Sequence, residues 1–184
     1  AQYANEAKIE IGKLWATSQT ITGPVLNVPA KKVISEKGDI ETTVLHILPG
    51  SLTINGKVIP EIRYRGIYET VVYDSEITLS GDFTTEGFEN PEGYSYDWEH
   101  AFFTLGVSDS KGIRDKIVLN IDGESIDAEP GVLCSDLFET GISFPVALKT
   151  NGENEFKSKF DMKVGLRGSE YLSFIPVGKT TEVM

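Results

Sequence analysis

The chain has 184 residues, of which 28 are acidic and 17 basic, and its formal net charge is −11. This length favours one domain, and the 40% hydrophobic content is enough for a packed core. The acidic balance excludes binding to bulk nucleic acid, which needs a surplus of Lys and Arg. The single Cys134 excludes an internal disulfide and a cysteine-built zinc site.

The first twenty residues have helical periodicity. Apolar side chains recur at steps of three and four residues, and polar side chains occupy the other face. Thr22-Gly23-Pro24 ends the pattern. The sequence therefore predicts an N-terminal amphipathic helix within residues 1–22.

After residue 22 the hydrophobic period changes from 3.6 to 2, which is typical of half-buried strands. The clearest case is 156–167, where apolar residues alternate with Lys157, Lys159, Lys163 and other charged residues. Hairpin turns are predicted at Asn55-Gly56, Asp122-Gly123 and Asn151-Gly152. The predicted strands are 24–28, 42–48, 51–54, 62–73, 77–83, 117–121, 143–149, 156–167 and 171–176.

Many short strands separated by Gly-rich turns predict a mainly β fold, an antiparallel two-sheet sandwich-like domain over residues 23–184. The segment 54–68 weakly resembles 121–133. Two similar β units meeting at the loop 84–99 would explain this resemblance, and so would chance among hairpins.

The loop 84–99 combines acids with Tyr94, Tyr96 and Trp98. Exposed rings beside carboxylates are typical of sugar sites, where rings stack on the pyranose and acids accept hydroxyl protons or cleave. A solvated acidic loop with its rings folded onto the sheet is the alternative.

Arg63 and Arg65 share one face of a predicted strand, near Glu61 and Glu69. They are candidate contact residues for a partner, and cross-strand ion pairing is the alternative. Lys157, Lys159, Lys163 and Arg167 lie on one face of the predicted strand 156–167. Lysines on an exposed strand prevent pairing with other strands, and this explanation is favoured over a docking surface for a partner.

No catalytic or metal-binding motif is assembled in the sequence. His46, His100 and Cys134 are widely spaced, so no zinc site and no cofactor are predicted. Ser108 and Lys111 have the Ser-x-x-Lys spacing, but they lie in a polar turn without the partner motifs of penicillin-binding enzymes.

Several segments in order are similar to the CreD-like inner-membrane proteins, a family associated with cell-envelope integrity, colicin tolerance and stress response. They include Trp15–Pro29, Arg63–Tyr68, Ile77–Phe83, Phe102–Asp109, Leu166–Ser169 and Phe174–Thr181. The resemblance implies a periplasmic region of a Gram-negative inner-membrane protein, with residues 1–22 leaving the membrane after a first span. It brings no catalytic residues.

The residues and the family resemblance together lead to two expected functions. The first is a non-enzymatic periplasmic domain that binds an envelope protein or lipid, with Arg63, Arg65, Tyr94, Tyr96 and Trp98 as candidate contacts. The second is a glycan-binding or glycan-cleaving module that uses the loop 86–99.

Overall fold

The computed structural model describes residues 9–10, 15–86, 88, 91, 93–150 and 155–184. Of Arg65 it describes the backbone and not the side chain. The predicted N-terminal helix falls mainly on residues outside this range. Ile9, Glu10 and Trp15 have helical backbone, but Gln19 and Thr20 already belong to the first strand, so the helix does not reach residue 20.

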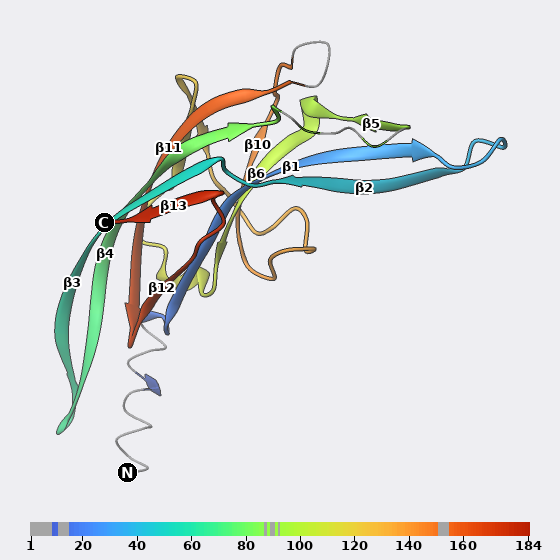
Figure 1. Cartoon of the computed structure of the whole chain (residues 1–184). Helices are drawn as coiled ribbons and strands as arrows, with labels where there is room; N and C mark the ends of the chain where they lie inside the picture. Colours follow the sequence, from blue (N-terminus) through green and yellow to red (C-terminus); the bar gives the residue numbers. More distant parts are fainter. Residues whose placement is uncertain (1–8, 11–14, 87, 89–90, 92, 151–154) are drawn as a thin grey trace.

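The described chain is mainly β, as predicted, and its strands form two sheets (Figure 1). The first sheet has the order β12-β1-β6-β10-β9, with β2 and β5 also paired to β1. Its strands are β1 (Gln19–Val33), β2 (Ile40–Ile47), β5 (Tyr94–Tyr96), β6 (Ala101–Val107), β9 (Glu129–Pro130), β10 (Gly141–Val146) and β12 (Leu172–Ile175).

The second sheet has the order β13-β3-β4-β11-β7-β8. Its strands are β3 (Ser51–Arg65), β4 (Tyr68–Thr84), β7 (Val118–Ile121), β8 (Glu124–Asp127), β11 (Lys157–Ser169) and β13 (Thr180–Val183). Short 3-10 turns, η1 (Trp98–His100) and η2 (Ser110–Gly112), flank β6. The predicted antiparallel arrangement is found in most strand pairs and is wrong at two edges, because β12 pairs parallel to β1 and β13 parallel to β3.

The core lies where the two sheets face each other. Phe103 of the first sheet packs against Phe83 of the second, with ring centroids 5.1 Å apart, and Phe83 is 5.1 Å from Phe160. The alternation predicted for 156–167 is confirmed, because the buried Ser158, Phe160, Met162, Val164 and Leu166 alternate with exposed charged residues and the half-buried Gly165. Both sheets therefore contribute to one hydrophobic core.

The turn predicted at Asn55-Gly56 is wrong. Both residues continue β3, paired with Thr78 and Ile77 of β4, and the chain reverses only at Gly66-Ile67. The Asp122-Gly123 turn is confirmed between β7 and β8, with positive φ at both residues. The turn predicted at Asn151-Gly152 lies outside the described residues.

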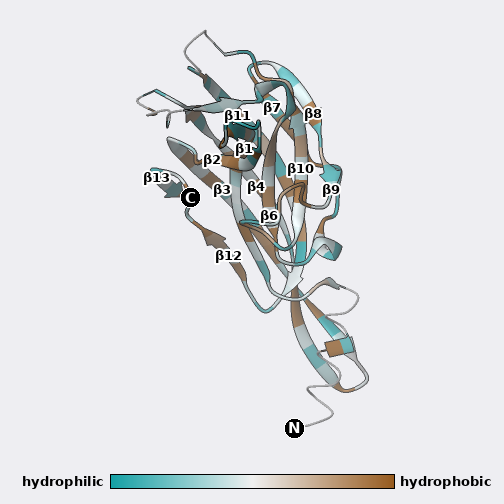
Figure 2. Cartoon of the chain, turned by 90° about the vertical axis from the view of Figure 1, so that its right-hand side faces the viewer, coloured by the Kyte–Doolittle hydropathy of each residue, from teal (hydrophilic) through white to brown (hydrophobic). Residues whose placement is uncertain are grey.

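The outer parts of β3 and β4 form a projecting hairpin, residues 57–76, called the β3–β4 arm below (Figure 1). A second hairpin, formed by β1 and β2, projects in another direction. Figure 2 shows apolar and polar residues interspersed along the β3–β4 arm. The strands of both arms extend beyond the common core and leave apolar side chains in solvent.

Candidate functional site

The tip of the β3–β4 arm contains the most exposed large apolar side chain of the described residues. Ile67 is 89% exposed and Tyr64 is 68% exposed. Ile62 pairs with Val71 on the same face as Tyr64, and both are exposed. Side chains two residues apart on a strand point to the same face, so Ile62 and Tyr64 lie on the face of β3 that is turned toward the core nearer the body of the domain. In the arm the first sheet no longer covers this face.

Arg63 lies on the opposite face of the arm. Its guanidinium is 2.8 Å from the Glu61 carboxylate and 4.9 Å from the centroid of the Trp15 ring. Arg167 of β11 lies 5.3 Å from the same ring. Trp15 therefore contacts two arginines, and its contact with Arg63 holds the chain leading into β1 against the arm. Arg65 continues the strand to the tip, and its side chain is not described.

The predicted aromatic loop is a ladder of rings along β5 and η1. Tyr94 and Tyr96 are stacked at 6.5 Å, Tyr96 is 6.4 Å from Trp98, and Trp98 is 6.2 Å from Phe156. Trp98 is only 7% exposed and belongs to the core. Tyr94 and Tyr96 are half-buried, and Lys32 lies over the Tyr94 ring. Of the three predicted rings, only the two tyrosines are therefore accessible to a sugar, and glycan binding here stays a prediction.

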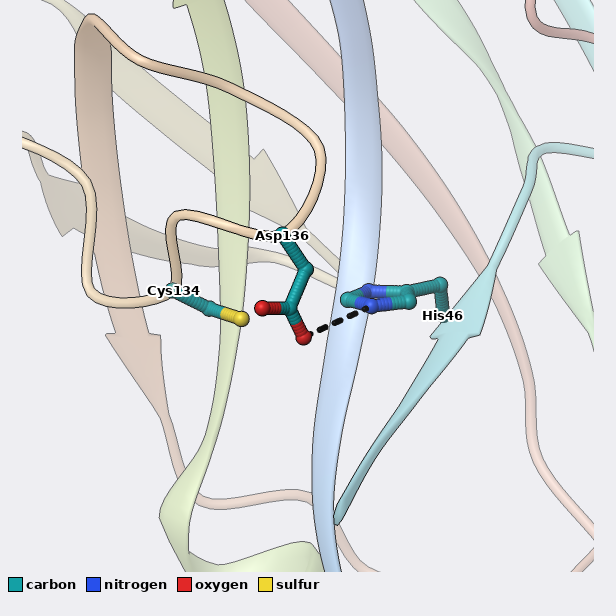
Figure 3. A group of neighbouring side chains, drawn as sticks. All are labelled: His46, Cys134 and Asp136. Atoms are coloured by element: carbon teal, nitrogen blue, oxygen red, sulfur yellow. Dashed lines mark ion pairs between the residues drawn. The ribbon is translucent and has the colours of Figure 1, made fainter.

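The structure brings together three potential metal ligands that lie far apart in the sequence. His46 comes from β2, and Cys134 and Asp136 come from the loop 131–140 between β9 and β10 (Figure 3). One ligand atom of each lies within 4.8 Å of the others, and His46 Nε2 is 3.7 Å from Asp136 Oδ2. We call these residues the His46–Cys134–Asp136 group.

A buried amide sets the orientation of His46. Asn27 of β1 is directly opposite His46 in the sheet, and its Oδ1 is 2.7 Å from His46 Nδ1. Asn27 Nδ2 donates to the carbonyl oxygens of Val25 and Phe102 and to Thr104 Oγ1. Because the two carbonyl oxygens can only accept, Asn27 turns its NH2 group toward them and its oxygen toward the imidazole, so that His46 Nδ1 is the donor in this hydrogen bond.

The loop 131–140 is fixed on the outer face of the first sheet. Ser143 Oγ accepts from the backbone N–H of Leu133 and donates to the Gly131 carbonyl oxygen. The Phe138 ring packs directly over Gly106, where a Cβ would not fit. Burial, as the main cause, raises the pKa of the Cys134 thiol, so the free sulfur keeps its proton at neutral pH. A groove of about 500 Å³ opens beside the group, between this loop, β1 and β2.

The sequence did not indicate the His46–Cys134–Asp136 group, because sequence spacing detects metal ligands only within local motifs. His46 and Cys134 meet through the pairing of β1 with β2 and the path of one loop. His100, the other histidine, is not part of this group and pairs with Asp97.

Comparison with known proteins gives one consistent result. The whole chain, residues 1–184, matches the family described as Inner membrane protein CreD. The chain is 24% identical over 189 residues to the Inner membrane protein CreD of Escherichia coli strain K12, covering 100% of this chain and 41% of that protein. No solved structure matches the chain.

The fold is thus a two-sheet β domain, and the chain belongs to the CreD family of inner membrane proteins. It spans less than half the length of the curated relative that it matches. In the described part of the chain, no helix has both the length and the apolar character that crossing a membrane requires. The family suggests a role associated with the cell envelope.

Proposed function

We propose that this chain is a periplasmic, non-enzymatic domain of an envelope-integrity protein and that it contacts the lipid–water interface of the inner membrane through the tip of the β3–β4 arm. The observation that carries this proposal is the exposed apolar tip. An isoleucine that is 89% exposed at the end of a projecting hairpin contributes nothing to the core and is costly in water.

The composition of the tip supports a lipid surface as the partner. Residues 62–68 contain two arginines, two tyrosines and two isoleucines, and no acid, in a chain whose net charge is −11. Tyrosine is favoured at the level of lipid headgroups, and arginine can hold its charge there while its stem lies along apolar groups. Apolar burial would provide most of the binding, since Glu61 already neutralises part of the charge of Arg63.

Family membership and the position of Trp15 support the proposal that the tip of the β3–β4 arm faces the membrane. Through its contact with Arg63, Trp15 holds the segment that precedes β1 against the arm, and the Arg167 guanidinium of β11 also lies over its ring. In the proposed arrangement this segment leads to the membrane, so the arm and the membrane attachment lie at the same end of the domain.

The test places an environment-sensitive fluorophore at the arm tip. The full chain carries Ile67→Cys in a Cys134→Ser background, and the matched control carries Ile34→Cys, an exposed apolar residue beyond the end of β1. With phosphatidylethanolamine–phosphatidylglycerol vesicles, we expect a blue shift and increased intensity at position 67 and no change at position 34.

Two results would contradict the proposal. An unchanged probe at position 67, or equal changes at positions 67 and 34, would show that the tip does not enter lipid specifically. If the probe at position 67 responded to native envelope preparations but not to vesicles, a protein partner would replace lipid at the tip.

A further inference from the structure

We propose that His46, Cys134 and Asp136 bind a divalent transition-metal ion of the zinc class, outside the region that contacts the membrane. The three residues offer one nitrogen, one sulfur and one oxygen, and all three donor types bind Zn²⁺ in proteins. Three protein ligands leave a fourth position for water or another ligand.

A positive charge fits between the facing atoms of His46 and Asp136. Because His46 Nδ1 faces Asn27 Oδ1, Nε2 is the ring nitrogen that points toward Asp136 and is available as a metal ligand. Nε2 faces the Asp136 carboxylate oxygen at 3.7 Å, and two acceptors at this distance repel each other unless a proton or a cation joins them. A metal ion satisfies both atoms and also uses the Cys134 sulfur, which a proton on the imidazole does not.

The distances are close to those of a tetrahedral site. Bond lengths of about 2.0–2.3 Å place ligand atoms roughly 3.3–3.8 Å apart around such an ion. The separation of His46 Nε2 and Asp136 Oδ2 is 3.7 Å, and all three ligand atoms lie within 4.8 Å of one another. A shift of about 1 Å in the cysteine or aspartate side chain, with no strand moving, completes this geometry.

The buried network behind His46 is of the kind that supports metal ligands. A metal-binding imidazole commonly donates its other N–H to a fixed oxygen, which sets the ring orientation and raises the basicity of the ligating nitrogen. Asn27 provides this oxygen, and the buried Asn27 side chain is itself fixed by its NH2 group, which lies within hydrogen-bond distance of three oxygens. The ligating nitrogen is therefore already oriented in the metal-free protein.

Metal binding would fasten the loop 131–140 to β2. Without a metal, hydrogen bonds to Ser143 attach the loop to β10. The ion pair between His46 and Asp136 connects it to β2. The metal would join the two segments and narrow the adjacent groove, which Cys134 and Asp136 line on one side and Thr42–Val44 on the other.

The test uses Co²⁺ as a spectroscopic probe on the full chain with its thiol kept reduced. We expect one equivalent of Co²⁺ to produce a thiolate-to-cobalt charge-transfer band in the near ultraviolet, together with visible bands of tetrahedral intensity. Zn²⁺ should abolish both by displacement. Cys134→Ser should remove the charge-transfer band.

The variants separate a built site from accidental binding. His46→Gln and Asp136→Asn should each weaken Co²⁺ binding by more than the roughly 10–100-fold expected when only a hydrogen-bond partner of a ligand is lost. His100→Gln is the matched control and should bind Co²⁺ like the unmodified chain, because His100 lies outside the group. All four variants alter side chains that are not fully buried, and circular dichroism should show the native β signature in each.

The proposal is overturned if no charge-transfer band forms, if the band persists unchanged in His46→Gln, or if His100→Gln weakens binding as much as the ligand variants do. None of these results bears on the membrane contact of the β3–β4 arm, which uses other residues.

Discussion

Asp97 and His100 form an exposed ion pair around η1. Asp97 Oδ1 accepts from the backbone N–H of His100 at 3.3 Å, and the imidazole Nδ1 lies 3.0 Å from the same oxygen. The hydrogen bond that the His100 imidazole donates to Asp97, followed by the charge of Asp97, raises the pKa of His100. The same hydrogen bond is the largest cause that lowers the pKa of Asp97. A single contact thus shifts both groups toward their charged forms.

The pH dependence of this pair has a definite sign. Because the folded pKa of His100 is raised, its contribution to stability is complete below the unfolded value of about 6.5 and is lost as the pH rises through the folded pKa. Because the pKa of Asp97 is lowered, its contribution is complete above about 3.9 and is lost as the pH falls through the folded pKa. The pair is therefore fully effective only between these limits.

We expect a proton NMR titration of the His100 ring to have its midpoint above that of an unperturbed histidine, and Asp97→Asn to bring the midpoint down. If the His100 midpoint were the same in both proteins, Asp97 would not be the cause of the shift.

At the scale of elements, the contact between β3 and β4 depends on a glycine. A Cβ at Gly81 would collide with the Ser51 carbonyl oxygen and would lie 3.1 Å from the Phe160 ring. Gly81 lies where β4 is paired on both sides, opposite Leu52 of β3 and Phe160 of β11. Neither the backbone of Ser51 nor the buried ring can move away easily.

We therefore expect Gly81→Ala to lower the free energy of unfolding by roughly 1–3 kcal/mol, as overpacking in a core does. Gly56→Ala is the matched control in the facing strand. Its Cβ would meet only Ile77 Cγ1 at an ordinary 3.8 Å, so we expect no loss and a gain of up to about 1 kcal/mol. Urea denaturation of both variants measures the difference, and equal effects would contradict the packing argument.

The two Asx-Gly pairs show how tertiary pairing overrides a local turn preference. Asp122-Gly123 turns because β7 and β8 end there and both residues adopt positive φ. Asn55-Gly56 has an equally good turn sequence. It remains extended because β3 stays in register with β4 from Ser51 to Arg65, and because the Gly56 N–H donates to the Met184 carbonyl oxygen beyond β13.

At the scale of the whole molecule, each sheet combines strands from both sides of the loop 84–99. In the first sheet, β1 pairs with β6, and in the second, β4 pairs with β11. Phe83 and Phe103, which lie on opposite sides of this loop, pack against each other in the core. The parts of the chain before and after the loop 84–99 therefore do not form separate sheets.

We expect that neither segment, 1–90 nor 91–184, folds when it is expressed alone, because each would expose the half of the core that the other covers. Mixing the two should restore the β circular dichroism and the dispersed NMR spectrum of the intact chain. A dispersed spectrum from either segment alone would show that it is an independent unit.

The sequence by itself determined the mainly β character, the buried and exposed faces of β11, the Asp122-Gly123 turn and the family. These properties depend on local alternation, on turn chemistry or on segments compared along the chain. The tertiary structure alone decided which strands pair, that Trp98 lies in the core, that Asn55-Gly56 does not turn, and that His46 meets Cys134 and Asp136. These outcomes depend on contacts between distant segments, and the burial free energy of the whole core, which favours them, exceeds any local preference.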